Sequence, residues 1–234
     1  MPNFRKIRIT RWIIRSVFIL FIIAINTLLL WRIFFSAQIP EELDRLSVNE
    51  DLKAAYEEYG ADLQLLYQDQ PSVTRAEYNY GYFSVPKCIF IPEASQVQVV
   101  FRYNNSTLEH LATDYSLEEI PSRELDLFDV TLVRTTDKTP DNKDDNTNAE
   151  ALEKERFSPT SVKREATSLY TYYLYVFENV SVEDVTAGVF VDIYYVEDID
   201  YEDTAYGTLC IYSPDDEWLS HSLTRADKKA LAAR

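Results

Sequence analysis

Residues 16–31 read SVFILFIIAINTLLLW, and they decide the architecture because none of them is charged. A bilayer core needs about 20 predominantly apolar residues in a helix. The run reaches that length when residues 13–14 and 33–35, all Ile or Phe, are included. Arg15 and Arg32 then lie near the two interfaces, where long basic side chains can reach the headgroups. The sequence therefore predicts one transmembrane helix over residues 12–36.

The charges on either side of this helix predict its orientation. Residues 1–11 form a basic tail, and no acidic residue occurs before Glu41. Basic residues concentrate on the cytoplasmic side of a membrane span. We therefore expect a single-pass protein of the cell membrane, with a cytoplasmic N-terminus and an extracytoplasmic C-terminal domain.

A cleaved signal peptide has the same basic-then-apolar layout. Cleavage near residue 37 would put Phe34 or Phe35 where a small side chain is required. An uncleaved signal anchor is accordingly the prediction.

Acidic residues dominate the chain after the helix. Six of the 23 Lys and Arg residues lie within the first 32 positions, which leaves 17 against 39 Asp and Glu. Such a domain is repelled by nucleic acid and by anionic surfaces. We expect no nucleic-acid partner, contact with the bilayer through residues 12–36, and a protein partner outside the cytoplasm.

Residues 37–70 predict a juxtamembrane amphipathic helix. Ser47 and Glu50 have the spacing of a capping box, and apolar residues recur every three or four positions from Val48 to Leu66. The helix would either pair with another helix or pack on its own domain. We favour packing on the domain because the stripe is shorter than three heptads.

Residues 71–222 have the pattern of strands rather than helices. Apolar and polar residues alternate in several short runs that are rich in β-branched and aromatic side chains. The fold class is therefore mainly β, and an antiparallel β-sandwich is expected. Its topology could be immunoglobulin-like, although the Cys…Trp…Cys spacing of true immunoglobulin domains is missing. The predicted strands are 87–91, 97–103, 128–132, 169–177, 189–195 and 207–212.

The alternation also assigns residues to faces. Odd-numbered apolar residues should point inward, and Gln98, Arg102 and Asp192 should face solvent. The inward set is Val99, Phe101, Val189, Val191 and Ile193.

Three connecting segments complete the domain. Ser106 and Glu109 predict a second capping box that opens a short helix up to Ala112. Residues 136–163 are polar and predict a disordered loop. Residues 223–234 predict a C-terminal helix or tail.

No catalytic motif occurs, so we predict no enzymatic activity, no catalytic residue and no cofactor-binding residue. His110 and His221 lack a recognisable partner pattern, and four glycines do not make a phosphate loop. An enzyme without a recognisable motif remains the third-ranked alternative for function.

Two acidic segments are weak candidates for calcium. The first resembles an EF-hand loop, but Ala149 stands where glycine makes the sharp turn. The second is an acidic turn before the last predicted strand. The candidate metal ligands are Asp144, Asn146, Asn148 and Glu155 in the first segment, and Asp198, Asp200 and Glu202 in the second.

Cys88 and Cys210 both lie in predicted strands outside the cytoplasm. An oxidising compartment permits a disulfide between them, and two buried thiols are the alternative. Both interpretations stay open at the level of sequence because the Cα separation decides between them.

These features predict a membrane-anchored extracytoplasmic interaction module. The alternative is a cell-wall or carbohydrate-binding domain, with or without the help of calcium, because the chain is rich in tyrosine at 78–82 and 170–175. Exposed aromatic rings on one sheet face would favour the sugar, and an apolar patch or open strand edge would favour a protein.

Overall fold

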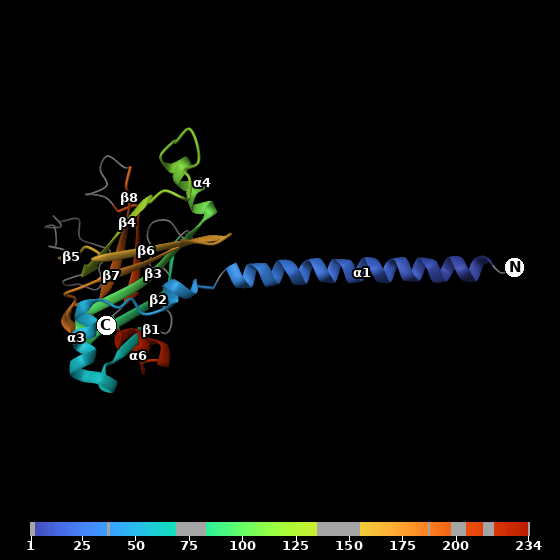
Figure 1. Cartoon of the computed structure of the whole chain (residues 1–234). Coiled ribbons are helices and arrows are strands. Elements are labelled where there is room, and N and C mark those ends of the chain that lie inside the picture. The colour runs from blue at the N-terminus through green and yellow to red at the C-terminus, as the bar shows by residue number, and fades with distance from the viewer. Residues whose placement is uncertain are drawn as a thin grey trace, which may run out of the picture. The chain divides into compact units, whose positions relative to one another are not determined.

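A computed structural model describes residues 3–36, 38–68, 83–134, 155–186, 188–197, 205–212 and 218–233. The chain divides into two compact units, residues 1–38 and 39–234. Figure 1 shows both units and labels many of their elements. The helical elements are α1 (Asn3–Ser36), α2 (Glu41–Asp44), α3 (Glu50–Tyr59), η1 (Gly60–Asp62), η2 (Pro92–Ala94), α4 (Asn105–Asp114), α5 (Val182–Thr186) and α6 (Arg225–Leu231).

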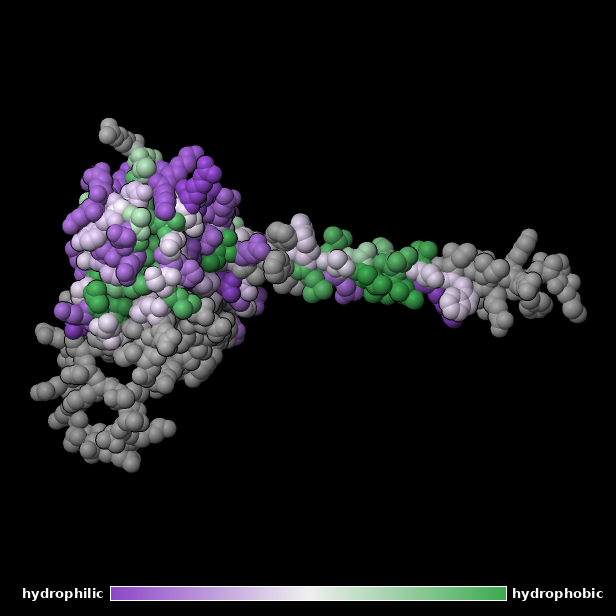
Figure 2. Space-filling view, turned by 90° about the horizontal axis from the view of Figure 1, so that it is seen from below, coloured by the Kyte–Doolittle hydropathy of each residue, from purple (hydrophilic) through white to green (hydrophobic). Residues whose placement is uncertain are grey.

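The first unit is the helix α1. Among the described residues, Ile14–Trp31 is the one segment long and apolar enough to cross a membrane, and none of it is buried. Figure 2 shows the hydrophobic surface of this segment. Its two polar side chains bond within the helix, Asn26 Nδ2 to Ile22 O at 2.8 Å and Thr27 Oγ1 to Ile23 O at 2.9 Å. A span needs such internal satisfaction because hydrocarbon supplies no hydrogen-bond partner.

The second unit contains two antiparallel sheets together with the helices from α2 to α6, so it is a mixed helix and sheet domain. The six-stranded sheet has the order β10-β1-β2-β3-β7-β6, and the four-stranded sheet has the order β5-β4-β8-β9. The mainly-β prediction is correct for the sheets but underestimates the helices. The strands are β1 (Leu65–Gln68), β2 (Phe83–Ile91), β3 (Gln96–Asn104), β4 (Phe128–Arg134), β5 (Glu155–Phe157), β6 (Ser161–Ala166), β7 (Tyr170–Phe177), β8 (Val189–Tyr195), β9 (Gly207–Tyr212) and β10 (Trp218–His221).

One face of each sheet contributes to a shared core. The Phe128 ring from β4 lies 5.1 Å from Phe83 of β2 and 5.0 Å from Tyr103 of β3, centroid to centroid. The predicted inward residues are confirmed: all five are buried in this core. Their register is fixed because a one-residue slip would turn the whole apolar set out of the core.

The predicted solvent-facing residues are wrong for two of three positions. Gln98 is 1% exposed and Asp192 is 3% exposed, whereas Arg102 is half-buried. Thr208 Oγ1 donates to Asp192 Oδ1 at 2.6 Å, which stabilises the buried carboxylate. A period of two shows which residues share a face, but it does not show whether another part of the chain covers that face.

Residues 39–49 cover part of the outer face of the six-stranded sheet, and we call them the strap. Leu43 packs with Val100, Tyr172 and Leu174, and it is almost fully buried. Ser47 N donates to Gln98 Oε1 at 2.9 Å, and Gln98 Nε2 donates to Ser47 O at 2.7 Å. These contacts bury the outer-face amide that the sequence pattern had assigned to solvent.

The predicted helix over residues 37–70 is therefore too long at both ends. Helix α3 begins after Asn49, whose side chain accepts from Leu52 N, so Asn49 and not Ser47 is the cap. Gly60 has a φ of 55°, a conformation that ends the helix and favours glycine. Leu65–Gln68 then forms strand β1, because pairing with β2 and β10 satisfies its backbone.

Two further predictions need correction. Helix α4 is capped by Asn104 with Thr107, not by Ser106 with Glu109. Part of the loop predicted at 136–163 is strand: β5 pairs with β4, and β6 pairs with β7. Their polar composition hid them, because edge strands exposed to water need no apolar alternation. Residues 136–154 lie outside the described residues. Helix α6 confirms the predicted C-terminal helix, with Thr224 as its cap.

Candidate functional site

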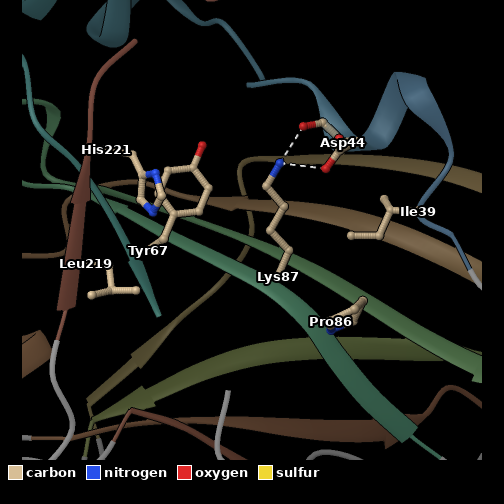
Figure 3. Close-up of a pocket in the computed structure, with 7 residues that line it drawn as sticks. All are labelled: Ile39, Asp44, Tyr67, Pro86, Lys87, Leu219 and His221. Atoms are coloured by element: carbon tan, nitrogen blue, oxygen red, sulfur yellow. Dashed lines mark hydrogen bonds and ion pairs between the residues drawn. The ribbon is translucent and has the colours of Figure 1, made fainter. Parts of the chain in front are cut away.

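An open cavity of about 400 Å³ lies on the outer face of the six-stranded sheet. The strap forms one side, and strands β1, β2 and β10 form the other (Figure 3). Its lining residues are Ile39, Asp44, Tyr67, Pro86, Lys87, Leu219 and His221.

A bulge in β2 creates the position of Lys87. Pairing of β2 with β3 shifts between Ser84 and Lys87, so the strand gains a residue there. Before the shift Phe83 and Val85 face the shared core, and after it Cys88 and Phe90 do. Lys87 would otherwise continue the inward series. The bulge contains Pro86, which lacks an N–H donor and so fits where the ladder is interrupted.

The Lys87 ammonium holds the strap. Lys87 Nζ donates to Asp44 Oδ1 at 2.8 Å and also to the Asp44 backbone carbonyl. It lies 5.7 Å from the centre of the Tyr67 ring, on its face. Two of its three donors are thus used within the chain, and its charge is neutralised by Asp44. We interpret Lys87 mainly as the residue that fixes the strap to the sheet.

Tyr67 and His221 give the pocket its remaining polar groups. Their rings meet edge to face with centroids 4.7 Å apart. Burial, with added repulsion from the charges of Asp227 and Asp44, raises the pKa of Tyr67 to about 12. Its hydroxyl therefore stays protonated near neutral pH and can donate a hydrogen bond, but it cannot serve as a base there. The pocket can bind a small polar group, and its geometry supplies no nucleophile activated by a base.

The candidate calcium ligands are not brought together within the described residues. Asp144, Asn146, Asn148, Asp198, Asp200 and Glu202 lie outside them, and Glu155 begins β5. Where the structure describes the chain, no group of three or more His, Cys, Asp or Glu could hold a metal. Calcium binding stays a prediction.

The Cys88–Cys210 disulfide, one of the two interpretations that the sequence left open, is not formed, and both residues are buried. Cys88 belongs to the shared core. Cys210 lies between Leu209 and Ile211, which both face that core, so alternation turns Cys210 to the opposite side of β9. Burial raises the pKa of the Cys88 thiol to about 12, which makes it a poor nucleophile.

The tyrosines of β7 do not form an exposed aromatic platform. Tyr172, Tyr173 and Tyr175 are buried, and the Arg102 guanidinium lies 4.5 Å from the centre of the Tyr170 ring. Tyr78, Tyr80 and Tyr82 lie outside the described residues. His110 is exposed on α4, on a different element from His221.

The sequence did not predict that four of the pocket residues lie next to one another. These residues are Asp44, Tyr67, Pro86 and Lys87. Pro86 within a strand-like run was the available signal, because proline in a strand marks an edge or a bulge. No sequence signal links Asp44 to Lys87, since only the path of the strap brings them together.

Comparison with protein-family models, with curated proteins and with solved structures finds no match to this chain.

Proposed function

We propose that this protein is a non-enzymatic interaction module that is anchored in the cell membrane by α1, with its acidic domain outside the cytoplasm. Its two sheets form a β-sandwich in this proposal. The observation that carries it is the wholly exposed apolar segment Ile14–Trp31, which is joined to a separately packed domain. An exposed helix of that length is stable in a bilayer and costly in water.

Exposed apolar side chains support a protein as the partner. Ile120 is 57% exposed and Leu125 is 51% exposed, both in the connection between α4 and β4. We take these two exposed apolar side chains on one connection as the place where a protein partner would bind. The buried tyrosines of β7 lend no support to the carbohydrate-binding alternative.

Orientation is tested with a reporter that is active only outside the cytoplasm, fused after Arg234. We expect activity, and the purified chain should keep its N-terminal residues 3–15. Activity of a cytoplasmic reporter at the same position would overturn the orientation. A chain that begins near residue 38 would show a cleaved signal and a released domain.

The partner is tested by placing a photo-crosslinking amino acid at Leu125 in native membranes. We expect a discrete protein adduct there. The matched control is Tyr59 on α3, which is 43% exposed but lies on a different element. Equal labelling from both positions, or none from Leu125, would contradict a protein interface at this connection.

A further inference from the structure

Strand β6 is an edge of the six-stranded sheet. The hairpin that joins it to β7 shows which of its residues direct their backbone N–H and C=O groups toward β7 and which toward the open side. Thr167 N donates to Tyr170 O at 2.8 Å across the turn that joins β6 to β7. In an antiparallel ladder such bonded pairs alternate with unbonded pairs. Positions 163 and 165 therefore bond toward β7. Val162, Arg164 and Ala166 direct their backbone N–H and C=O groups to the open side.

Among the described outer strands, β6 is a six-residue edge on which no other described strand is paired, and α2 of the strap lies near it. β5 has three residues and β10 has four, while β9 lies beside β2. β6 has six residues, and Val162 is 50% exposed. A row of unpaired backbone groups of this kind is a template for another strand.

We propose that β6 pairs antiparallel with β6 of a second copy of this chain, with Arg164 opposite Arg164 and Val162 opposite Ala166. In this register every residue that directs its backbone to the open side meets another such residue. The six-stranded sheets of the two copies then become continuous.

Charge selects this register. On the outer face it puts Lys163 opposite Glu165, and twofold symmetry makes that pair twice. Moving the second strand by two residues puts Lys163 opposite Lys163 or Glu165 opposite Glu165. Opposite charges across a strand pair stabilise it, and like charges destabilise it. Lysines on edge strands often prevent pairing with other chains. Here Lys163 lies opposite Glu165 in one register only, so it permits pairing in that register and disfavours the others.

The unfavourable element of this register is the self-opposed Arg164. Each guanidinium is held within its own chain, where it donates to the Arg123 carbonyl and, at 3.0 Å, to Glu124 O. Arg164 Nε also lies 3.7 Å from Asp126 Oδ1. These contacts neutralise part of the charge that would otherwise face its copy.

The proposed pair has twofold symmetry. The twofold axis of an antiparallel pair is perpendicular to the sheet, so the strap covers the same side of the joined sheet in both copies. Confinement to a membrane also raises the effective concentration of the copies. The pairing itself does not depend on the orientation or the protein partner proposed above.

The test is a charge exchange in the full chain, reconstituted in vesicles with donor or acceptor fluorophores attached after Arg234. Lys163→Glu and Glu165→Lys each turn two attractive pairs into two repulsive ones, so each should raise the protein density needed for half-maximal energy transfer by roughly tenfold. The double variant restores opposite charges, and its energy transfer should return to that of the wild type.

Val162→Pro gives a second test that does not use charge. It removes a donor on the open side and none on the β7 side, so energy transfer should fall while the thermal unfolding midpoint changes little. Wild-type transfer no greater than random proximity produces would overturn the proposal. So would equal transfer from the wild type and all three charge variants, which would indicate association through α1.

Discussion

Gln98 shows what a single buried amide does in this domain. Its side chain bonds both backbone groups of Ser47 and donates to Gln96 Oε1 at 2.8 Å. The Gln98 side chain therefore attaches the strap to β3, and it also bonds to its neighbour Gln96 on that strand. An amide in this place is specific, because neither an apolar nor an acidic side chain can both donate and accept in the same way.

Gln98→Ala should lower the free energy of unfolding by roughly 1–3 kcal/mol, because it leaves the Ser47 N–H and C=O buried without a partner. Denaturant unfolding of the detergent-solubilised chain measures this. Gln64→Ala is the control, since that exposed side chain has no such contacts and its replacement should be nearly silent. Equal effects of the two substitutions would mean that the strap does not cover β3.

Cys88 should be inert to thiol reagents in the folded protein. Its pKa of about 12, raised by burial, leaves almost no thiolate at a pH of about 8. We expect labelling of Cys88 to follow unfolding, so the rate should rise steeply with denaturant; mass spectrometry identifies the labelled cysteine. Rapid labelling of Cys88 without denaturant would contradict the core position of β2.

At the scale of elements, the strap and the bulge in β2 work together. The bulge turns Lys87 to the outer face, and Lys87 then holds Asp44. Asn49, which caps α3, also donates to the Glu178 carboxylate at the far end of the strap. The strap is thus fixed at its middle through Asp44 and at its end through Asn49, and Leu43 packs on the sheet next to Asp44.

Lys87→Met should loosen the strap without unfolding the sheets. The Lys87–Asp44 pair is partly exposed, and such pairs contribute about 0.2–1 kcal/mol, so global stability should change little. Hydrogen exchange of the backbone amides of residues 41–46 should become several-fold faster. Arg45→Met is the control, because it removes only the exposed Arg45–Glu41 pair within the strap. Identical exchange in both variants would show that Lys87 does not hold the strap.

At the scale of the whole molecule, the two sheets are joined by aromatic rings that carry hydroxyl groups. Tyr173 and Tyr175 stack with centroids 5.7 Å apart, and Tyr175 Oη donates to Phe128 O of the other sheet. Burial raises the pKa of both phenols, and nearby Asp129 and Asp126 add to the shift of Tyr175. Ionisation of these tyrosines therefore opposes folding of this core.

The domain should lose stability as pH rises from about 10 to about 12. The unfolded chain releases its phenol protons near pH 10, whereas folded Tyr67 keeps its proton up to about 12. The folded state then binds more protons than the unfolded state, so unfolding becomes easier with rising pH. Thermal midpoints across this range measure the loss. Tyr67→Phe should make the loss shallower, and a flat profile in the wild type would contradict these shifts.

The sequence alone determined the features that depend on local pattern. The uncharged run 16–31 predicted the apolar helix, because hydrophobic length needs no tertiary partner. Strict alternation around Phe101 and Val191 predicted which residues enter the core. The local pattern of residues 224–234 predicted the last helix, with Lys228, Lys229 and Arg234 near its end, where basic residues favour a helix.

Only the tertiary structure decided what covers each face. Gln98 and Asp192 look like solvent-facing residues in their strands, yet the strap buries the first and a bond from Thr208 satisfies the second. Cys88 and Cys210 looked equivalent until the strand faces were assigned. The physical reason is that burial of an outer face depends on contacts between residues far apart in the chain, such as Ser47 with Gln98, and local periodicity carries no information about them.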